Sequence, residues 1–83
     1  MATEYRTKER ALEWGCHYAG ITRATLDRIA PEEVRIGWPH DITLEGYRVT
    51  TAAGRIGVLG VAPMGDGYQL WLIDAETGGA QRT

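Results

Sequence analysis

Residues 16–29 are the one stretch of this sequence in which residue types and spacing together suggest a task. Gly20 is well placed to end a helix, and Thr22 can cap the next one by accepting hydrogen bonds from its free amides. Two helices joined by such a turn pack at a steep angle, with the first turn of the second helix facing outward. Two arginines, Arg23 and Arg28, lie in the second helix after the hydroxyl cap.

The stretch also resembles the helix-turn-helix of the LacI family, whose members commonly carry Ala-Gly-Val-Ser-x-x-Thr-Val-Ser-Arg-Val. The shared elements are the glycine of the turn, the hydroxyl cap and the arginine late in the second helix. The resemblance implies that two arginines and an alanine face base edges in the major groove, while two threonines bind phosphate. The DNA-binding residues implied in this way are Thr22, Arg23, Ala24, Thr25 and Arg28. An ordinary helical corner with both arginines in solvent fits the same residues, and that alternative stays open.

Charge does not favour a dedicated nucleic-acid binder. The 83 residues carry a formal net charge of −2, whereas proteins that neutralise phosphates usually have clustered lysines and arginines. Residues 1–30 have five basic and four acidic side chains, and residues 31–83 have four basic and seven acidic ones. The N-terminal third can therefore approach a polyanion, while the remainder is better suited to staying in solution.

Other groups of reactive residues carry no chemical role. Cys16, His17, His40 and Asp41 lack the two-to-four-residue ligand spacing that holds zinc. Adjacent residues on a helix point about 100° apart, so Cys16 and His17 cannot share a proton. The glycines that recur every third residue over 54–60 fit turns and bulges better than a phosphate loop, because no helix follows them. We expect no catalytic activity, no cofactor and no metal, with Cys16 a buried thiol.

The periodicity predicts helices in the first part of the chain. Residues 4–19 place apolar side chains on one stripe, and a second helix follows the Thr22 cap. Pro31 and the two glutamates after it predict a third short helical piece that ends near Gly37. Because the chain has no phenylalanine, its tryptophans and tyrosines are expected to supply most of the core; the tryptophans are Trp14, Trp38 and Trp71.

Strand-like patterns follow in the second part. The predicted strands are 42–51, 55–62 and 68–73, joined by connections short enough to require antiparallel hairpins. The second strand is apolar on both faces and is expected in the middle. The predicted fold class is therefore α+β in a single domain, with a helix-turn-helix-like corner at about 4–37 packed on a three-stranded antiparallel β-meander at about 42–73. Residues 77–83 are expected to form a flexible tail.

Two functions follow from these observations. The first is a small DNA-binding regulator of transcription that acts as a homodimer, with the sheet or first helix at the interface. The second is a small acidic protein that binds another protein as an inhibitor or adaptor, as phage-encoded anti-CRISPR proteins do. Trp71 with Leu59 or Val61 forms either an interaction surface for that purpose or part of the core. A single cysteine, with neither a leader nor a long apolar run, favours a cytoplasmic location without membrane contact.

Overall fold

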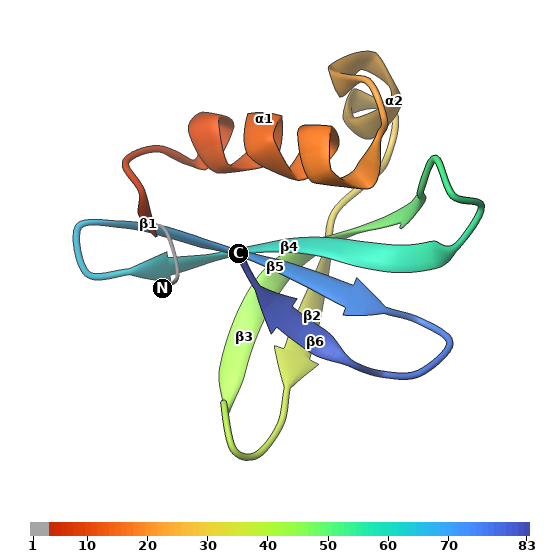
Figure 1. Ribbon diagram of the computed structural model, residues 1–83. Coiled ribbons are helices and arrows are strands. Elements are labelled where there is room, and N and C mark those ends of the chain that lie inside the picture. The colour runs from red at the N-terminus through yellow and green to blue at the C-terminus, as the bar shows by residue number, and fades with distance from the viewer. Residues whose placement is uncertain (1–3) are drawn as a thin grey trace.

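The computed structural model describes residues 4–83, in which two helices lie on one face of a six-stranded antiparallel sheet (Figure 1). The elements are β1 (Glu4–Tyr5), α1 (Lys8–Ala19), α2 (Arg23–Asp27), β2 (Glu32–Ile36), β3 (Ile42–Thr50), β4 (Ile56–Met64), β5 (Gly67–Asp74) and β6 (Ala80–Arg82). The α+β class and the antiparallel sheet are confirmed. The sheet has twice as many strands as the predicted meander.

The sheet is built around β4 and β5. Its order is β1-β5-β4-β3-β2, and β6 also pairs with β5. Since β4 pairs with the whole length of β5, the two short strands share the other edge of β5. There β1 pairs with its first half and β6 with its second half. The opposite edge of the sheet is β2, which pairs only with β3.

All three additional strands correct the sequence-based predictions. Residues 4–5, predicted as the start of a helix, form β1. Residues 32–36, predicted as helical, form β2, because Val34 and Ile36 alternate along a strand and lie opposite Leu44 and Ile42 of β3. This long-range pairing outweighs the local helix-start signal of Pro31. The predicted flexible tail is also wrong for residues 80–82, which form β6, and Thr83 N donates a hydrogen bond to Leu70 O at 3.0 Å.

Helix α1 begins and ends at identifiable caps. Thr7 Oγ1 accepts a hydrogen bond from Arg10 N at 3.1 Å, so the helix begins at Lys8 and not at the predicted residue 4. At the other end Gly20 adopts the predicted left-handed conformation, with φ of 71°. The next residue, Ile21, donates its amide to Cys16 O at 3.0 Å. These caps fix both the length and the direction of α1.

The main core lies between α1 and the sheet. Its fully buried centre includes Leu12 of α1, Leu26 of α2 and Leu59 of β4. Gly15 permits the close approach of α1, since a Cβ atom there would lie 2.6 Å from Leu59 Cδ1. A glycine inside a helix is typical of a place where another backbone passes close by, whereas the neighbour here is a side chain. Cys16 is buried as predicted.

The sheet face that points away from the helices, called the back face here, has its own apolar cluster. Leu44, Ala62 and Trp71 are buried in it. The ring of His40, from the β2–β3 loop, lies edge-on to Trp71 with centroids 4.9 Å apart. Leu59 belongs to the main core on the other side of the sheet. Trp71 and Leu59 are therefore both core residues on opposite faces, and they do not form a shared interaction surface.

Two of the three tryptophans are not in the core, contrary to prediction. Trp14 is 40% exposed and Trp38 is 93% exposed. Small residues of α1 allow the helix to lie close to the sheet, so aliphatic side chains fill most of the space between them, together with the buried Tyr5 and Tyr47. Within residues 4–83, no helix is long and apolar enough to cross a membrane.

Candidate functional site

The corner between α1 and α2 has the predicted local chemistry at its turn. Thr22 Oγ1 accepts a hydrogen bond from Thr25 N at 3.2 Å, which caps α2. The same oxygen lies 2.9 Å from Thr25 Oγ1, so the two hydroxyls bond to one another. The cap predicted at Thr22 is confirmed. Both threonines nevertheless use their hydroxyls within the corner.

Arg23 joins the two helices through an ion-pair network. Its Nη2 lies 2.9 Å from Glu9 Oε2 of α1, and its Nε lies 2.9 Å from Asp27 Oδ1 of α2. The hydrogen bond to Asp27 and the nearby charge of Glu9 raise the pKa of the guanidinium above its usual value. Two carboxylates therefore hold the side chain that the resemblance places against DNA bases.

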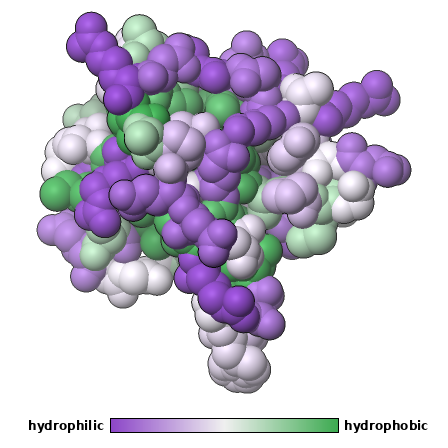
Figure 2. Space-filling model, turned by 180° about the vertical axis from the view of Figure 1, so that it is seen from behind, coloured by the Kyte–Doolittle hydropathy of each residue, from purple (hydrophilic) through white to green (hydrophobic). Residues whose placement is uncertain are grey.

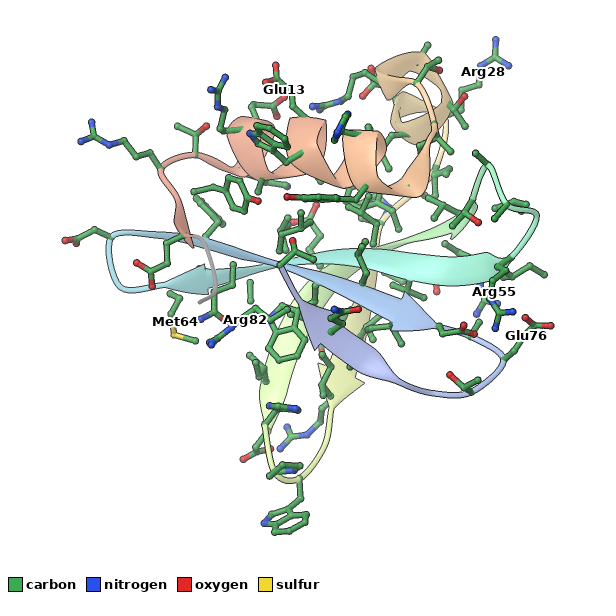
Figure 3. The ribbon with its side chains drawn as sticks, in the orientation of Figure 1. Glu13, Arg28, Arg55, Met64, Glu76 and Arg82 are labelled. Carbon is green, nitrogen blue, oxygen red and sulfur yellow. The ribbon has the colours of Figure 1, made fainter. Side chains whose placement is uncertain are left out.

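Helix α2 spans five residues, Arg23–Asp27, and ends before Arg28, which caps it. Ala24 is exposed on this short helix. Figure 3 shows Arg28 pointing away from the body of the molecule, and within residues 4–83 it makes no ion pair. Of the five predicted site residues, Arg28 alone presents an unengaged charge to solvent.

The solvent-exposed side of α1 carries a cluster of aromatic rings that the sequence-based reasoning missed. Trp14 contacts His17 with ring centroids 5.5 Å apart, and it contacts Tyr18 at 5.9 Å. His17 and Tyr18 contact one another at 5.8 Å. Arg10 lies one turn before Trp14, so Arg10, Trp14 and Tyr18 follow a spacing of four along one stripe. The aromatic face, as the term is used below, consists of Arg10, Trp14, His17 and Tyr18.

The aromatic face is bordered by hollows along its length. One, of about 280 Å³, is lined by Arg10, Glu13, Trp14 and His17. Another, of about 430 Å³, is lined by Glu4, Tyr5, Arg6, Thr7, Arg10 and Trp14. Trp14 and Arg10 thus border both hollows.

Charge on the aromatic face is balanced. Arg10 Nη1 lies 3.7 Å from Glu13 Oε2, and both side chains are more than 60% exposed. Figure 3 shows Glu13 extending away from the sheet above α1. An exposed pair at this distance contributes little to stability, so both groups stay available for contacts with another molecule.

Tyr18 connects the aromatic face to a third hollow, of about 380 Å³, at the end of α1. The walls of this hollow include Ile56 and Val58 of β4. At its rim Arg55 donates to Asp74 Oδ2 from Nε at 3.0 Å and from Nη2 at 2.6 Å. Its Nη2 also lies 3.2 Å from Glu76 Oε2, and Figure 3 shows Arg55 and Glu76 side by side. The hydrogen bonds from Arg55 lower the pKa of Asp74 below its usual value.

A separate polar network holds α1 on the sheet. Lys8 Nζ lies 2.6 Å from Glu45 Oε1 of β3, and Tyr47 OH donates to the same oxygen at 2.9 Å. The hydrogen bond from Lys8 lowers the pKa of the Glu45 carboxyl. This network positions the N-terminal half of α1, where Arg10 and Trp14 begin the aromatic face.

Cys16 and His17 are adjacent in α1 but lie in different environments. Burial raises the pKa of the Cys16 thiol, which lowers its reactivity because the thiolate is the reactive form. His17 is exposed on the other side of the helix. Across residues 4–83, no three histidine, cysteine or carboxylate side chains are grouped so that they could hold a metal ion.

No protein-family model, curated protein or solved structure matches this chain.

Proposed function

We propose that this chain is a small protein-binding module that blocks or adapts a partner protein through the aromatic face of α1. The observation that supports this proposal is the exposure of Trp14 and Tyr18, which are 40% and 51% exposed on a well-capped helix. Large aromatic side chains that gather on a surface mark sites of interaction. The face is therefore the part of the molecule best suited to bind a partner.

The residue types on this face are those that carry most binding energy in protein interfaces. Tryptophan, tyrosine and arginine are enriched at such hot spots, and here Trp14, Tyr18 and Arg10 follow one stripe. The three rings contact one another, and the caps fix the helix beneath them. Binding to such a pre-organised surface costs less conformational entropy than binding to a mobile one.

The charges favour a protein partner over a polyanion. Arg10 is offset by Glu13 beside it, and the whole chain has a net charge of −2. Binding to a phosphate backbone gains most of its free energy from clustered cations. The aromatic face has no such cluster, and it supplies apolar area with a few polar groups at its border.

A comparative capture experiment tests this function. The tagged chain is incubated with nuclease-treated lysate, and retained proteins are quantified for the wild type, Trp14→Ala, Tyr18→Ala and Met64→Ala. Met64 is a matched control because it is 37% exposed at the end of β4. We expect a protein retained by the wild type and by Met64→Ala, and lost from both aromatic variants. Equal retention by all four chains would contradict the proposal, provided that circular dichroism shows that each variant is folded.

DNA binding through α2 is a second candidate, supported by Arg28 and by the turn geometry at Gly20 and Thr22. Fluorescence anisotropy with a mixed pool of DNA duplexes at two salt concentrations tests it. If this function holds, Arg28→Ala weakens binding by about 1–3 kcal/mol, whereas Arg48→Ala, on an exposed residue of β3, leaves it unchanged. Absence of salt-sensitive binding removes this candidate.

A further inference from the structure

The β2 edge is the one long edge of the sheet that no other strand of the described residues covers. At the opposite edge, β1 and β6 together occupy the outer side of β5. In contrast, β2 pairs with β3 on one side only. An edge strand exposes unpaired amide and carbonyl groups and is a template for pairing with another chain. The five residues of β2, Glu-Glu-Val-Arg-Ile, therefore need a partner or protection.

We propose that β2 pairs antiparallel with β2 of a second copy, about a two-fold axis at Val34. In this register Glu33 of each copy lies opposite Arg35 of the other, and Val34 lies opposite its own counterpart. Opposite charges that face each other across antiparallel strands are stabilising. Both charged side chains are accessible, since Glu33 is exposed and Arg35 is 68% exposed even with Asp41 beside it.

Other registers lack this complementarity. A two-fold axis perpendicular to the sheet leaves every side chain on its own face of the sheet. Residues that lie opposite each other must point to the same face, so the axis has to pass through a residue and not between two residues. An axis at Glu32, Glu33 or Arg35 places that charged residue opposite its own copy, which is destabilising. An axis at Ile36 leaves most of β2 unpaired with its counterpart. Only an axis at Val34 pairs all five residues and opposes Glu33 with Arg35.

The same register gives Trp38 a place to pack. Antiparallel pairing brings the C-terminal end of β2 in one copy to the N-terminal end of β2 in the other, so the hairpin tip that carries Trp38 lies near the Ala30–Pro31 segment of the second copy. Ala30 and Pro31 are exposed, and Trp38 is 93% exposed. Trp38 lies in the tip of the β2–β3 hairpin, which projects from the body of the molecule (Figures 1 and 2). Leaving a tryptophan in water is costly, and packing on this apolar segment removes that cost.

The hairpin tip is held in shape before any contact with a second copy. The amides of His40 and Asp41 both donate to Gly37 O at 3.0 Å, and Arg35 pairs with Asp41 across the base of the loop. A guanidinium has five donors, so Arg35 can bond to Asp41 and to Glu33 of the second copy together. The segment is therefore pre-organised for pairing.

Pairing through β2 does not cover the aromatic face of either copy. A two-fold axis perpendicular to the sheet keeps the helices of both copies on the same side of a continuous sheet. Each copy's aromatic face lies on α1, which packs over β4 and β5 and not on the β2 edge. Pairing through β2 thus leaves both aromatic faces open. The inference does not depend on the proposed function.

Sedimentation equilibrium of the full chain tests the dimer. The monomer mass is 9.2 kDa, and we expect the wild type to reach twice that mass reversibly as concentration rises. Arg35→Glu places like charges opposite each other and is expected to raise the dimer dissociation constant roughly tenfold or more. Trp38→Ala is expected to weaken the dimer as well, whereas Arg48→Glu, on β3, leaves it unchanged.

Exchanging the charges at positions 33 and 35 distinguishes loss of the contact between the two copies from loss of the folded structure. Glu33→Arg alone weakens the dimer. In an Asp41→Ala background, where no carboxylate of the same chain lies beside position 35, the double variant Glu33→Arg/Arg35→Glu restores it, because the opposite charges face each other again. Asp41→Ala alone keeps the dimer, because the backbone bonds to Gly37 O still hold the turn. A wild type that stays monomeric up to about millimolar concentration overturns the proposal. A dimer that is indifferent to Arg35→Glu and Trp38→Ala, or not restored by the double variant, overturns it too.

Discussion

The α2 corner and the aromatic face of α1 both lie on the helical layer, but their polar and aromatic groups are used differently. In the corner, Arg23 is held between Glu9 and Asp27, and the hydroxyls of Thr22 and Thr25 bond to each other. On the aromatic face the rings of Trp14, His17 and Tyr18 contact one another, and all three residues stay exposed to solvent. A side chain whose polar groups are already held by partners within its own chain contributes to the fold. A large aromatic side chain that stays exposed is available for recognition.

The largest change in stability is expected at Leu59, because the helix α1 that carries the aromatic face and leads into the α2 corner packs on it. Leu59 is fully buried beneath Gly15 of α1, so Leu59→Ala should lower the free energy of unfolding by about 2–5 kcal/mol. Urea denaturation measures this change. Ile56→Ala, on an exposed residue of the same strand, is the control and should stay within about 0.5 kcal/mol. Equal effects of the two substitutions would mean that α1 does not rest on Leu59.

The aromatic face should lose binding without losing stability. Trp14→Ala is expected to weaken the complex with a captured partner by about 2 kcal/mol or more, which is roughly thirtyfold. Its free energy of unfolding should change far less than that of Leu59→Ala, because Trp14 is 40% exposed. Calorimetric titration and urea denaturation of the same variant measure the two quantities. A Trp14→Ala variant with normal partner affinity but a much lower free energy of unfolding would show that Trp14 stabilises the fold and does not bind the partner.

The corner should show the opposite behaviour. Thr22→Ala removes the cap of α2 and should cost about 1 kcal/mol of stability, with no effect on partner binding. Thr22→Ser keeps the capping hydroxyl and is the matched control. Loss of binding in Thr22→Ala, with stability unchanged, would assign the corner to recognition.

The smallest effect concerns the network between Lys8 and Glu45. The pKa of the Glu45 carboxyl is lowered in the folded chain from its ordinary value of 4.5. Its contribution to stability is therefore present above that value and is lost as pH falls through the lowered pKa of the folded state. Unfolding of the wild type and Lys8→Met between about pH 3 and pH 7 measures this contribution. Identical pH dependence in the two chains would show that the pair adds nothing.

Local patterns predicted the parts of the fold that local chemistry determines. Helix α1, the Gly20 end, the Thr22 cap and the three long strands follow from periodicity and from turn residues close in sequence. Strands β1, β2 and β6 could not be predicted in the same way. Each is five residues or shorter and forms only because another strand lies beside it. At Pro31 the local signal even favoured a helix.

Only part of the candidate site could be predicted from the sequence. Asp27 stands four residues after Arg23, so its engagement of that arginine could have been foreseen, whereas that of Glu9 depends on how the helices pack. The spacing of four that joins Trp14 and Tyr18 was also visible. Large aromatic residues are nevertheless expected in the core, because nothing local in the sequence shows how closely Gly15 lets α1 approach the sheet.

Oxidative footprinting of the chain, alone and with its captured partner, tests the central claim most directly. Hydroxyl radicals oxidise exposed tryptophan, tyrosine and methionine side chains, so Trp14, Tyr18 and Met64 report on different parts of the surface in one experiment. We predict that Trp14 and Tyr18 are oxidised more slowly in the complex, while Met64 is oxidised at the same rate. Unchanged oxidation of Trp14 and Tyr18 in the complex would contradict the assignment of the aromatic face as the binding surface.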